Sequence, residues 1–444
     1  MIQELYNHFL KHPVVCTDTR DIKQGSIFFA LKGDNFNANK FAEQALDSGC
    51  SLVVIDEVFP LSKGARGINQ LADERYFLVE DVLFTLQALA NHHRKQLSIP
   101  IISITGTNGK TTSKELLNAV LSQKYNVLAT KGNLNNHIGV PLTLLNITKQ
   151  HEIAIVEMGA NHVGEISMLC AIAEPDFGMI TNIGKAHLEG FGGYEGVVKA
   201  KSELYQFIQK KGGKLFVNAD NKLLQQLSAG IENVTFGTLE SVDFEGQFVE
   251  SNPFVKLKFK AKKDIQPIEE KPVITTQLIG NYNFENILAA ACIGHYFDVS
   301  DEQIKAGLEN YVPANNRSQV MQTKSNLLLL DAYNANPSSM NAAIENFAQM
   351  DQPNKMAILG DMLELGDDSA KEHDSIVNLL KNKNITNLIL VGPFFKESGR
   401  SINAKTFSNS DEVVDYLKQH PVKDSTILIK GSRGIKLEKV VELL

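Results

Sequence analysis

The segment G-T-N-G-K-T-T at residues 106–112 constrains the fold of this chain more than any other feature of its sequence. The residues before it, I-P-I-I-S-I-T, form an almost continuous apolar run, as expected of a strand buried on both faces of a parallel sheet. Apolar residues recur at helical spacing after it, at Leu116, Leu117, Val120 and Leu121. A glycine-rich loop between a strand and a helix is the context that a phosphate-binding loop requires. The sequence therefore predicts an α/β domain that binds a nucleotide.

The residue types of this loop suit a triphosphate. Glycines let backbone N–H groups approach phosphates, and the N-terminus of the following helix favours anions. Lys110 can reach the β- and γ-phosphates, and the hydroxyl of Thr111 can reach Mg²⁺. The usual motif has another glycine where this chain has Ile104, so a chance glycine-rich turn is the alternative to ATP binding. The candidate ATP-binding residues of the loop are Gly106, Thr107, Asn108, Gly109, Lys110, Thr111 and Thr112.

Three regions follow one another along the chain. Residues 1–97 hold short apolar runs, a predicted surface loop at Pro60–Asn69 and a helical stretch over 82–97. Residues 98–312 alternate strands and helices, with a predicted helix at 285–296. Within them, the period-two pattern of F-V-K-L-K-F-K-A predicts a small antiparallel insertion. The alternation resumes in residues 313–444. We therefore expect an α/β protein of three domains: a small N-terminal one, a central parallel-sheet P-loop domain and a Rossmann-like C-terminal one.

Polar residues stand where the predicted strands end. Ligands of open α/β sheets bind outside the carboxyl ends of the strands, so we expect these residues to line a shared cleft. Oxygen donors suit Mg²⁺, which makes Glu157 a candidate ligand, with an ordinary strand-end carboxylate as the alternative. His187, by residue type alone, is more typical of a structural position. The strand ends are Thr105–Gly106, Glu157, Asn182, Asp331, Asp361 and Lys430.

Composition excludes several other classes of protein. With 43% hydrophobic and 21% charged residues the chain is ordinary for a globular protein, and its net charge of -7 argues against a nucleic-acid-binding surface. The four cysteines form no C-x-x-C pair and indicate reduced thiols. Neither a signal core nor an apolar run of about eighteen residues is present, so we expect a cytoplasmic protein without membrane insertion.

Several segments together resemble the Mur ligases of peptidoglycan synthesis, over nearly the whole chain. The elements shared with that family are T-G-T-N-G-K-T-T, the Glu157 strand, N-I-G-K-A-H-L-E-G-F, the A-K-S-E-L segment around Lys201, G-N-Y-N-F-E-N and Arg317. Four further segments are similar to the branch that adds D-alanyl-D-alanine: K-G-N-L-N-N-H-I-G-V-P-L-T-L-L, E-M-G-A-N-H-V-G-E-I, D-A-Y-N-A-N-P-S-S-M and I-L-G-D-M-L-E-L-G.

This resemblance implies an ATP-dependent ligase that joins D-alanyl-D-alanine to UDP-N-acetylmuramoyl-tripeptide through an acyl phosphate, giving the pentapeptide precursor of peptidoglycan. The nearest rival is the branch that adds the third residue of the peptide. Its relatives carry a D-N-P-R-like segment, which this chain lacks. A rival from another class is a P-loop protein that binds ATP without ligating anything. The sequence leaves open whether the tripeptide ends in lysine or diaminopimelate.

The resemblance also implies catalytic and metal-binding roles. Thr111 and Glu157 match Mg²⁺ ligands, and His187 matches the ligand of a second Mg²⁺. Lys201 resembles a lysine that these enzymes carbamylate with CO₂. A protonated lysine repels a cation, whereas a carbamate is an anion with two oxygens. The implied catalytic set is Lys110, Lys201, His187 and Arg317.

Each region then receives an expected ligand from the resemblance. Residues 1–97 resemble the uridine-nucleotide domain, 98–312 the ATP-binding domain and 313–444 the domain for the incoming dipeptide. Beyond the loop, the implied ATP-binding residues are Asn283 and Asn286 near the adenine, Arg317 near the γ-phosphate and Asp331 near the ribose. The implied residues for the UDP-sugar-peptide are Thr17, Asp18, Thr19, Arg20, Asp34, Asn135 and Asn136, and those for the dipeptide are Asn334 and Asn336. We expect a monomer that closes around these substrates.

Overall fold

The structure is a computed structural model that describes residues 1–58, 73–314 and 316–444. The loop predicted at Pro60–Asn69 lies outside the described residues. The chain forms two compact units. The first contains residues 1–103, 125–159 and 165–177, and the second contains residues 104–124, 160–164 and 178–444.

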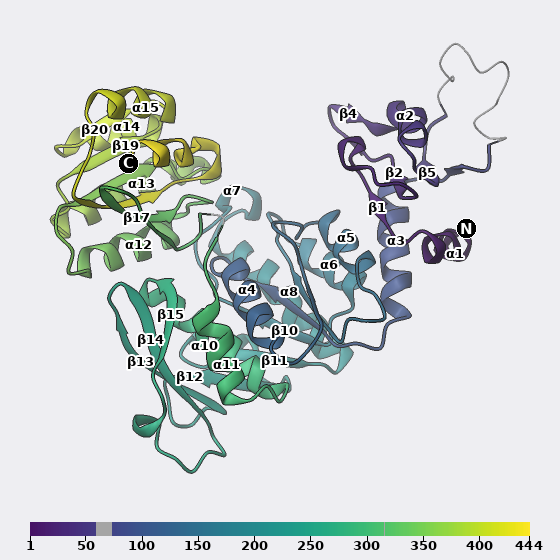
Figure 1. Cartoon of the computed structure of the whole chain (residues 1–444), viewed down its shortest axis with the longest axis horizontal. Coiled ribbons are helices and arrows are strands. Elements are labelled where there is room, and N and C mark those ends of the chain that lie inside the picture. Colours follow the sequence, from purple (N-terminus) through teal and green to yellow (C-terminus); the bar gives the residue numbers. More distant parts are fainter. Residues whose placement is uncertain (59–72, 315) are drawn as a thin grey trace. The chain divides into compact units, whose positions relative to one another are not determined.

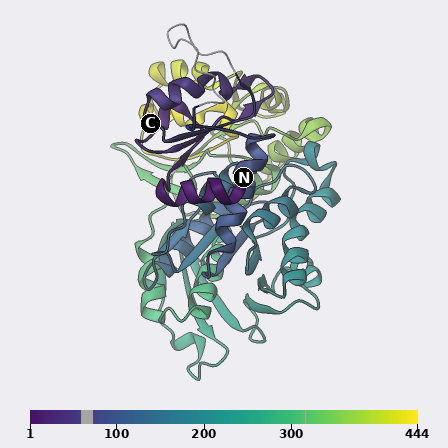
Figure 2. The same ribbon diagram turned by 90° about the vertical axis from the view of Figure 1, so that its right-hand side faces the viewer.

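Four short parallel strands form the N-terminal sheet, in the order β1-β2-β5-β6. The apolar runs of the first region supply its last three strands. Helix α1 packs on α3 (Figure 2), where the ring of Phe9 contacts His93 and the hydroxyl of Tyr6 lies 3.2 Å from His93 Nδ1. The elements are α1 (Ile2–Lys11), β1 (Val15–Cys16), β2 (Ile27–Phe29), β3 (Lys32–Gly33), β4 (Phe36–Asn37), α2 (Ala42–Asp47), β5 (Leu52–Ile55), β6 (Tyr76–Leu78) and α3 (Val82–Lys95).

A nine-stranded sheet forms the middle of the chain, in the order β15-β14-β13-β12-β11-β10-β7-β9-β8. The expected strand–helix alternation is present and places β9 beside β7. The strands are β7 (Ile101–Thr105), β8 (Val127–Ala129), β9 (Ile153–Glu157), β10 (Phe177–Ile180), β11 (Lys214–Asn218), β12 (Asn233–Gly237), β13 (Phe244–Ser251), β14 (Phe254–Ala261) and β15 (Ile274–Ile279). The helices are α4 (Lys110–Leu121), α5 (Gly139–Leu145), α6 (Glu165–Ala173), α7 (Leu188–Phe191), α8 (Tyr194–Lys211), α9 (Lys222–Leu227), α10 (Phe284–Tyr296) and α11 (Asp301–Asn310).

The predicted antiparallel insertion is present and extends this sheet rather than forming one of its own. Strand β14 pairs antiparallel with both β13 and β15, while β13 joins β12 in parallel. In β14 every second side chain is buried, as the period-two pattern predicts. Figure 1 shows β13, β14 and β15 as a ribbon of long strands beside α10 and α11.

The C-terminal sheet has the order β16-β17-β21-β18-β19-β20. Among the described residues of this sheet, β16 pairs antiparallel with β17, and the other strand pairs are parallel. The strand–helix alternation predicted for this region is present in β17, β18, β19 and β21. Its elements are β16 (Gln319–Gln322), β17 (Asn326–Asp331), α12 (Pro337–Gln349), β18 (Lys355–Gly360), α13 (Ser369–Asn382), β19 (Leu388–Val391), α14 (Pro393–Ser398), β20 (Lys405–Phe407), α15 (Ser410–Gln419) and β21 (Ser425–Lys430).

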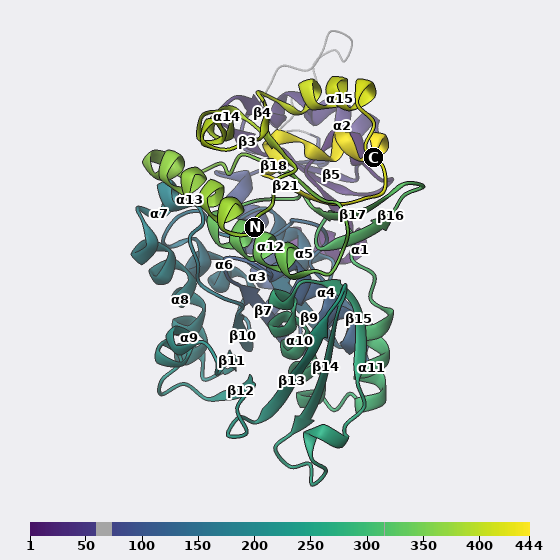
Figure 3. The same cartoon turned by 90° about the vertical axis from the view of Figure 1, so that its left-hand side faces the viewer.

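This sheet is covered on both faces, which explains why its strands read as continuous apolar runs. Leu329 of β17 packs into one core with α12 and α13, and its neighbours Leu328 and Leu330 pack into the other core with α15. Figure 3 shows the sheet between these two sets of helices. Burial of each leucine contributes roughly 1.5–3 kcal/mol.

All four cysteines are free thiols, as predicted. Among the described residues, none of the helices has the length and apolar character needed to span a bilayer.

Candidate active site

The loop after β7 has a backbone that only glycine can follow easily. Gly106 and Gly109 have φ of 144° and 80°. A Cβ on Gly106 would lie 2.0 Å from Thr181 Oγ1, and one on Gly109 would lie 2.5 Å from Asn286 Oδ1. Helix α4 begins at Lys110, directly after this turn. The glycines therefore allow both the turn and the close approach of neighbouring side chains.

The segment after β10 fixes the loop in place. The side chain of Asn182 bonds both backbone groups of Asn108, accepting from N at 3.0 Å and donating to O at 3.1 Å. Thr181 Oγ1 donates to the same carbonyl at 2.6 Å, and the N–H of Thr107 donates to the Asn182 carbonyl at 2.9 Å. The loop is thus held in one shape by the neighbouring strand end.

Lys110 lies over this loop. Its Nζ donates to the carbonyls of Gly106 at 2.7 Å and Thr107 at 3.0 Å. The ammonium therefore stands where the loop would cradle a phosphate. Thr111 is the second residue of α4 and is partly buried.

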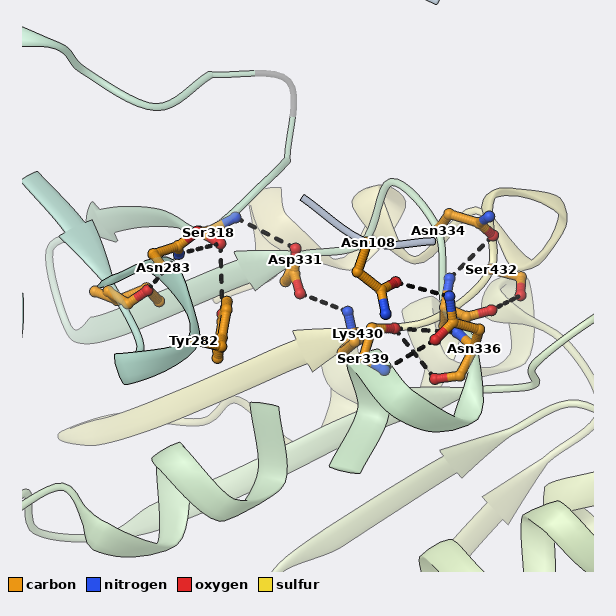
Figure 4. A network of polar contacts seen from close by, with 12 residues as sticks. Asn108, Tyr282, Asn283, Ser318, Asp331, Asn334, Asn336, Ser339, Lys430 and Ser432 are labelled. Carbon is orange, nitrogen blue, oxygen red and sulfur yellow. Dashed lines mark hydrogen bonds and ion pairs between the residues drawn. The ribbon is translucent and has the colours of Figure 1, made fainter. Parts of the chain in front are cut away.

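A chain of hydrogen bonds links α4 to the C-terminal sheet, and Figure 4 shows its part from Asn283 through Ser318 to Asp331. Ser113 Oγ donates to Asn286 Oδ1 at 3.0 Å, and Asn286 Nδ2 donates to Asn283 Oδ1 at 2.9 Å. Asn283 Nδ2 donates to Ser318 Oγ at 3.1 Å, and the N–H of Ser318 donates to Asp331 Oδ1 at 3.3 Å. The structure thus connects three residues predicted separately on the adenine and ribose sides.

Asp331 is also paired with a cation. Lys430 Nζ lies 2.5 Å from Asp331 Oδ2, and the lysine side chain is 2% exposed. Both residues end neighbouring strands, because β17 and β21 pair in register at these positions. This ion pair holds the Asp331 carboxylate against Lys430 at the strand end.

Arg317 stacks on the ring of Tyr333, with 3.6 Å between its guanidinium carbon and the ring centroid. Tyr333 follows β17 in the D-A-Y-N-A-N-P segment. The stack holds the guanidinium near the end of the strand that carries Asp331.

Asn336 has a structural task at the start of α12. Its Oδ1 accepts from the N–H of Ser339 at 2.9 Å and caps the helix. Its Nδ2 donates to Asn108 Oδ1 at 2.8 Å (Figure 4). Its amide thus joins the nucleotide loop to α12. Asn334, in contrast, is exposed, and its Oδ1 accepts from the N–H of the next residue at 3.0 Å.

The Nδ1 of His187 lies against a carboxylate oxygen of Glu364. The hydrogen bond from His187 lowers the pKa of the Glu364 carboxyl below its usual value. Nearby, Lys185 Nζ lies 2.7 Å from Glu372 Oε1, and the N–H of Lys185 donates to Ser338 Oγ at 3.2 Å. The contact at Nδ1 leaves Nε2 as the nitrogen of His187 that can meet a metal.

Lys201 lies inside the protein on α8, with only 2% of the residue exposed. Its Nζ is 3.5 Å from the carbonyl of Ala160 and 5.3 Å from the ring centroid of Phe191. The side chain thus lies between α7 and the segment before α6, and its carbamylation stays a prediction.

Glu157 belongs to the first unit and ends β9 with 1% of the residue exposed. Asn135 Nδ2 donates to Glu157 Oε1 at 2.8 Å. Asn136 Oδ1 accepts from the N–H groups of Ile138 at 3.1 Å and Gly139 at 2.9 Å and so starts α5. The asparagine pair predicted for the sugar-peptide thus holds the predicted metal ligand as well as a helix.

The uridine-side residues occupy the loops of the N-terminal sheet. Asp18 accepts from the backbone and the guanidinium of Arg20, and this guanidinium lowers the pKa of Asp18 to about 2. Thr17 and Thr19 flank Asp18, and Asp34 is exposed in the β3–β4 turn. Four of these residues therefore cluster in one short turn.

Asp361 directly follows β18, as predicted, but the prediction that its side chain lines a cleft is wrong. The side chain is fully buried, and its two oxygens accept from the N–H groups of Phe394 at 3.0 Å and Phe395 at 2.8 Å. A carboxylate can satisfy the first N–H groups of a helix, and here it starts α14.

Sequence reasoning missed several residues that complete this arrangement. Thr181, Ser318, Tyr333 and Glu364 carried no assigned role, although Glu364 lies in the segment I-L-G-D-M-L-E-L-G. Their partners are distant in sequence, so no local spacing could have indicated them.

Among the described residues, no three His, Cys, Asp or Glu side chains form a metal-binding group. The predicted ligand set contains only two such residues, Glu157 and His187. Its other two members are Thr111 and the lysine predicted to be carbamylated, Lys201. The donors are oxygens and one imidazole, a set that suits Mg²⁺.

Comparison with known proteins decides the family. Residues 104–294 match the model of the Mur ligase middle domain, and residues 316–433 match that of the Mur ligase glutamate ligase domain. The chain belongs to the Mur ligase family.

Individual Mur ligases match the chain over nearly its whole length. UDP-N-acetylmuramoyl-tripeptide–D-alanyl-D-alanine ligase of Bacillus subtilis is 35% identical over 437 residues, which cover 96% of this chain and 92% of the relative. The crystal structure of MurF from Acinetobacter baumannii has a TM-score of 0.84 at 30% identity and covers 96% of this chain and 92% of its own. MurF of Thermotoga maritima in complex with ADP has a TM-score of 0.82 at 26% identity, with 98% and 97% covered. The α/β fold expected from the sequence, with a parallel-sheet middle part and an α/β C-terminal part, agrees with these structures.

Proposed function

We infer that this Mur ligase joins D-alanyl-D-alanine to UDP-N-acetylmuramoyl-tripeptide, with conversion of ATP to ADP and phosphate. The observation that carries this inference is the match to the Bacillus subtilis enzyme of that name, which leaves no large part of either chain uncovered. The nucleotide loop and the polar network around it give the chain the parts that such a ligase needs.

The reaction has two steps. The carboxylate of the tripeptide attacks the γ-phosphate of ATP, which forms an acyl phosphate and releases ADP. The amine of the dipeptide then attacks the acyl carbon, and phosphate leaves as the C–N bond forms. The first step brings an anion against a triphosphate, so catalysis depends on positioning and on offsetting charge.

We assign to Lys110 and Arg317 the task of offsetting the negative charge of the triphosphate. The position of Lys110 over the loop and the stacking of Arg317 on Tyr333 support the assignment. Loss of one such preorganised contact costs about 10²–10³ in rate. Asn286 and Asp331 complete the site on the adenine and ribose sides.

Thr111, Glu157, His187 and carbamylated Lys201 are the residues that we assign to Mg²⁺. Bound Mg²⁺ would neutralise charge on the transferring phosphate. The place of Glu157 supports this assignment, because it ends β9, which lies beside the strand that leads into the loop at residues 106–112.

We assign the three substrates to the three parts of the chain. In this proposal residues 1–97 bind the uridine nucleotide, 98–312 bind ATP and 313–444 bind the dipeptide. Thr17 to Arg20, Asp34, Asn135 and Asn136 serve the first substrate. Asn334 serves the dipeptide, whereas Asn336 acts on the nucleotide loop because both ends of its amide are engaged.

Phosphate release from ATP tests the proposal, with lysine- and diaminopimelate-type UDP-tripeptides side by side and with or without D-alanyl-D-alanine. We expect turnover that requires both substrates and a product whose mass contains the dipeptide. Turnover with a single amino acid and a UDP-linked dipeptide, in place of the UDP-tripeptide, would instead indicate the branch that adds the third residue. ATP binding without any product would indicate a non-catalytic P-loop protein.

A further inference from the structure

Two guanidinium groups lie over the ring of Tyr333. The carbon of the Arg317 guanidinium lies 3.6 Å from the ring centroid, and that of Arg433 lies 5.5 Å from it. Arginine stacks on aromatic rings by cation–π attraction, which fixes the plane of a side chain that is otherwise free to rotate. Two like charges on one ring still repel each other.

No carboxylate of the described residues pairs with either guanidinium. The nearby lysine differs, because Lys430 is buried and its ammonium is matched by Asp331 at 2.5 Å. The two arginines thus place two positive charges close together, and an anionic ligand between them would offset their repulsion.

The backbone before Arg433 is held firmly. Ser432 is 3% exposed, and its Oγ donates to the carbonyl of Ala335 at 3.3 Å and accepts from the N–H of Leu363 at 3.0 Å. Figure 4 shows Ser432 beside the loop that carries Asn334 and Asn336. The side chain of Arg433 itself is exposed. A fixed base with an exposed guanidinium is a suitable arrangement for capturing a ligand from solvent.

We propose that Arg433 binds the C-terminal carboxylate of the incoming dipeptide, with Tyr333 holding the guanidinium. The proposal rests on the proposed function and names a residue for one of its substrates. A guanidinium binds a carboxylate through two parallel hydrogen bonds, which selects the geometry as well as the charge. The dipeptide carboxylate keeps its charge throughout the reaction and needs a cation in this region. Lys430 is engaged with Asp331, and Arg317 is assigned to the γ-phosphate.

The test compares D-alanyl-D-alanine with D-alanyl-D-alaninamide, which has the same amine but no carboxylate. A charge-assisted hydrogen bond of this kind changes kcat/KM by roughly 10- to 100-fold. The unmodified enzyme should prefer the dipeptide over its amide by about that factor. Arg433→Met should lower kcat/KM for the dipeptide by the same factor, leave the amide unchanged and leave the KM for ATP unchanged. Arg433→Lys keeps the charge but cannot form two parallel hydrogen bonds. Its kcat/KM for the dipeptide should fall between those of the unmodified enzyme and Arg433→Met.

Arg400→Met is the matched control, because Arg400 is also an exposed arginine of the C-terminal region but pairs with Glu397 at 2.8 Å. It should keep the full preference for the carboxylate. Equal losses with both acceptors, or a raised KM for ATP, would show that Arg433 serves the phosphate and would overturn the proposal. No change in Arg433→Met would also overturn it. If the unmodified enzyme turned over neither acceptor, the proposed function itself would fail.

Discussion

At the scale of single residues, the site depends on close approaches that leave no room for added atoms. Gly109 lies against Asn286, and Asn286 in turn bonds Ser113 of α4 and Asn283. Polar groups buried in such a chain are strong when all are satisfied and costly when one is displaced. One methyl group in the loop would therefore reach Asn286, which we propose for the adenine side.

We predict that Gly109→Ala weakens nucleotide binding. The residue would have to adopt a φ of 80°, and its Cβ would stand 2.5 Å from Asn286 Oδ1. The left-handed backbone alone costs about 1–2 kcal/mol. The dissociation constant of ADP, measured calorimetrically, should rise by at least roughly tenfold.

Gly230→Ala separates backbone strain from the close approach. Gly230 has a φ of 76°, but nothing lies within 4 Å of an added Cβ. This variant should lose stability and keep its affinity for ADP. Equal affinities in both variants would contradict the role given to Gly109.

Lys201 gives a second prediction at this scale. Lys201→Ala should lose most of its activity, by roughly 10²–10³ in rate, and an added small carboxylate should restore part of it. Lys199→Ala is the control, because Lys199 is exposed on the same helix. Full activity of Lys201→Ala in the phosphate-release assay would remove Lys201 from the site.

At the scale of elements, a buried histidine joins α13 to the segment after β18. His373 of α13 is fully buried, its Nε2 accepts from the N–H of Met362 at 3.0 Å and its Nδ1 lies 2.6 Å from the carbonyl of Ser369. These partners require the neutral ring with a proton on Nδ1. Burial lowers the pKa of His373 below its usual value.

We predict that this histidine destabilises the fold in acid. Because its folded pKa is depressed, its contribution is fully present above the unfolded pKa of about 6.5. As the pH falls below the unfolded pKa towards the folded pKa, this contribution to the free energy of unfolding is lost. The loss is up to about 1.4 kcal/mol per pH unit. The midpoint of urea unfolding should therefore drop between pH 7.5 and 5.5.

His373→Gln should remove most of this drop, because an amide does not titrate. Asp361, whose pKa burial raises, titrates in the opposite sense, so the difference between the two proteins isolates the histidine. The same pH dependence in both would contradict the prediction.

At the scale of the whole molecule, the second unit joins its nucleotide loop to the C-terminal sheet by side chains. The bond from Asn336 to Asn108 is one such link, and the contacts of Lys185 with Ser338 and Glu372 are others. Ligases of this kind bind three substrates, and closure around them is a common step. We expect these links to transmit nucleotide binding to the part that receives the dipeptide.

Asn336→Asp tests this expectation, because it keeps the oxygen that caps α12 and removes the donor to Asn108. Loss of one hydrogen bond of about 1 kcal/mol should lower kcat/KM for ATP roughly 2- to 12-fold without changing the unfolding temperature. Asn221→Asp, which replaces an asparagine that caps α9 through its oxygen, should change neither value. Unchanged kinetics of Asn336→Asp would show that the link is not used.

The sequence by itself determined the parts that depend on neighbours along the chain. The apolar runs before Gly106 and at β17, β18, β19 and β21 predicted buried parallel strands, and the alternation of β14 predicted an antiparallel segment. These patterns are local. A strand buried on both faces has apolar residues at consecutive positions, and a strand buried on one face has them at every second position.

Only the tertiary structure decided which polar side chains meet. Asp361 reads as a strand end like Asp331, yet the first is buried and caps α14, whereas the second faces Lys430. Asn334 and Asn336 look alike in sequence, but only the second bonds the nucleotide loop. A side chain's partners are set by which strands and helices pack together, and such contacts between distant residues leave no periodic trace in the sequence.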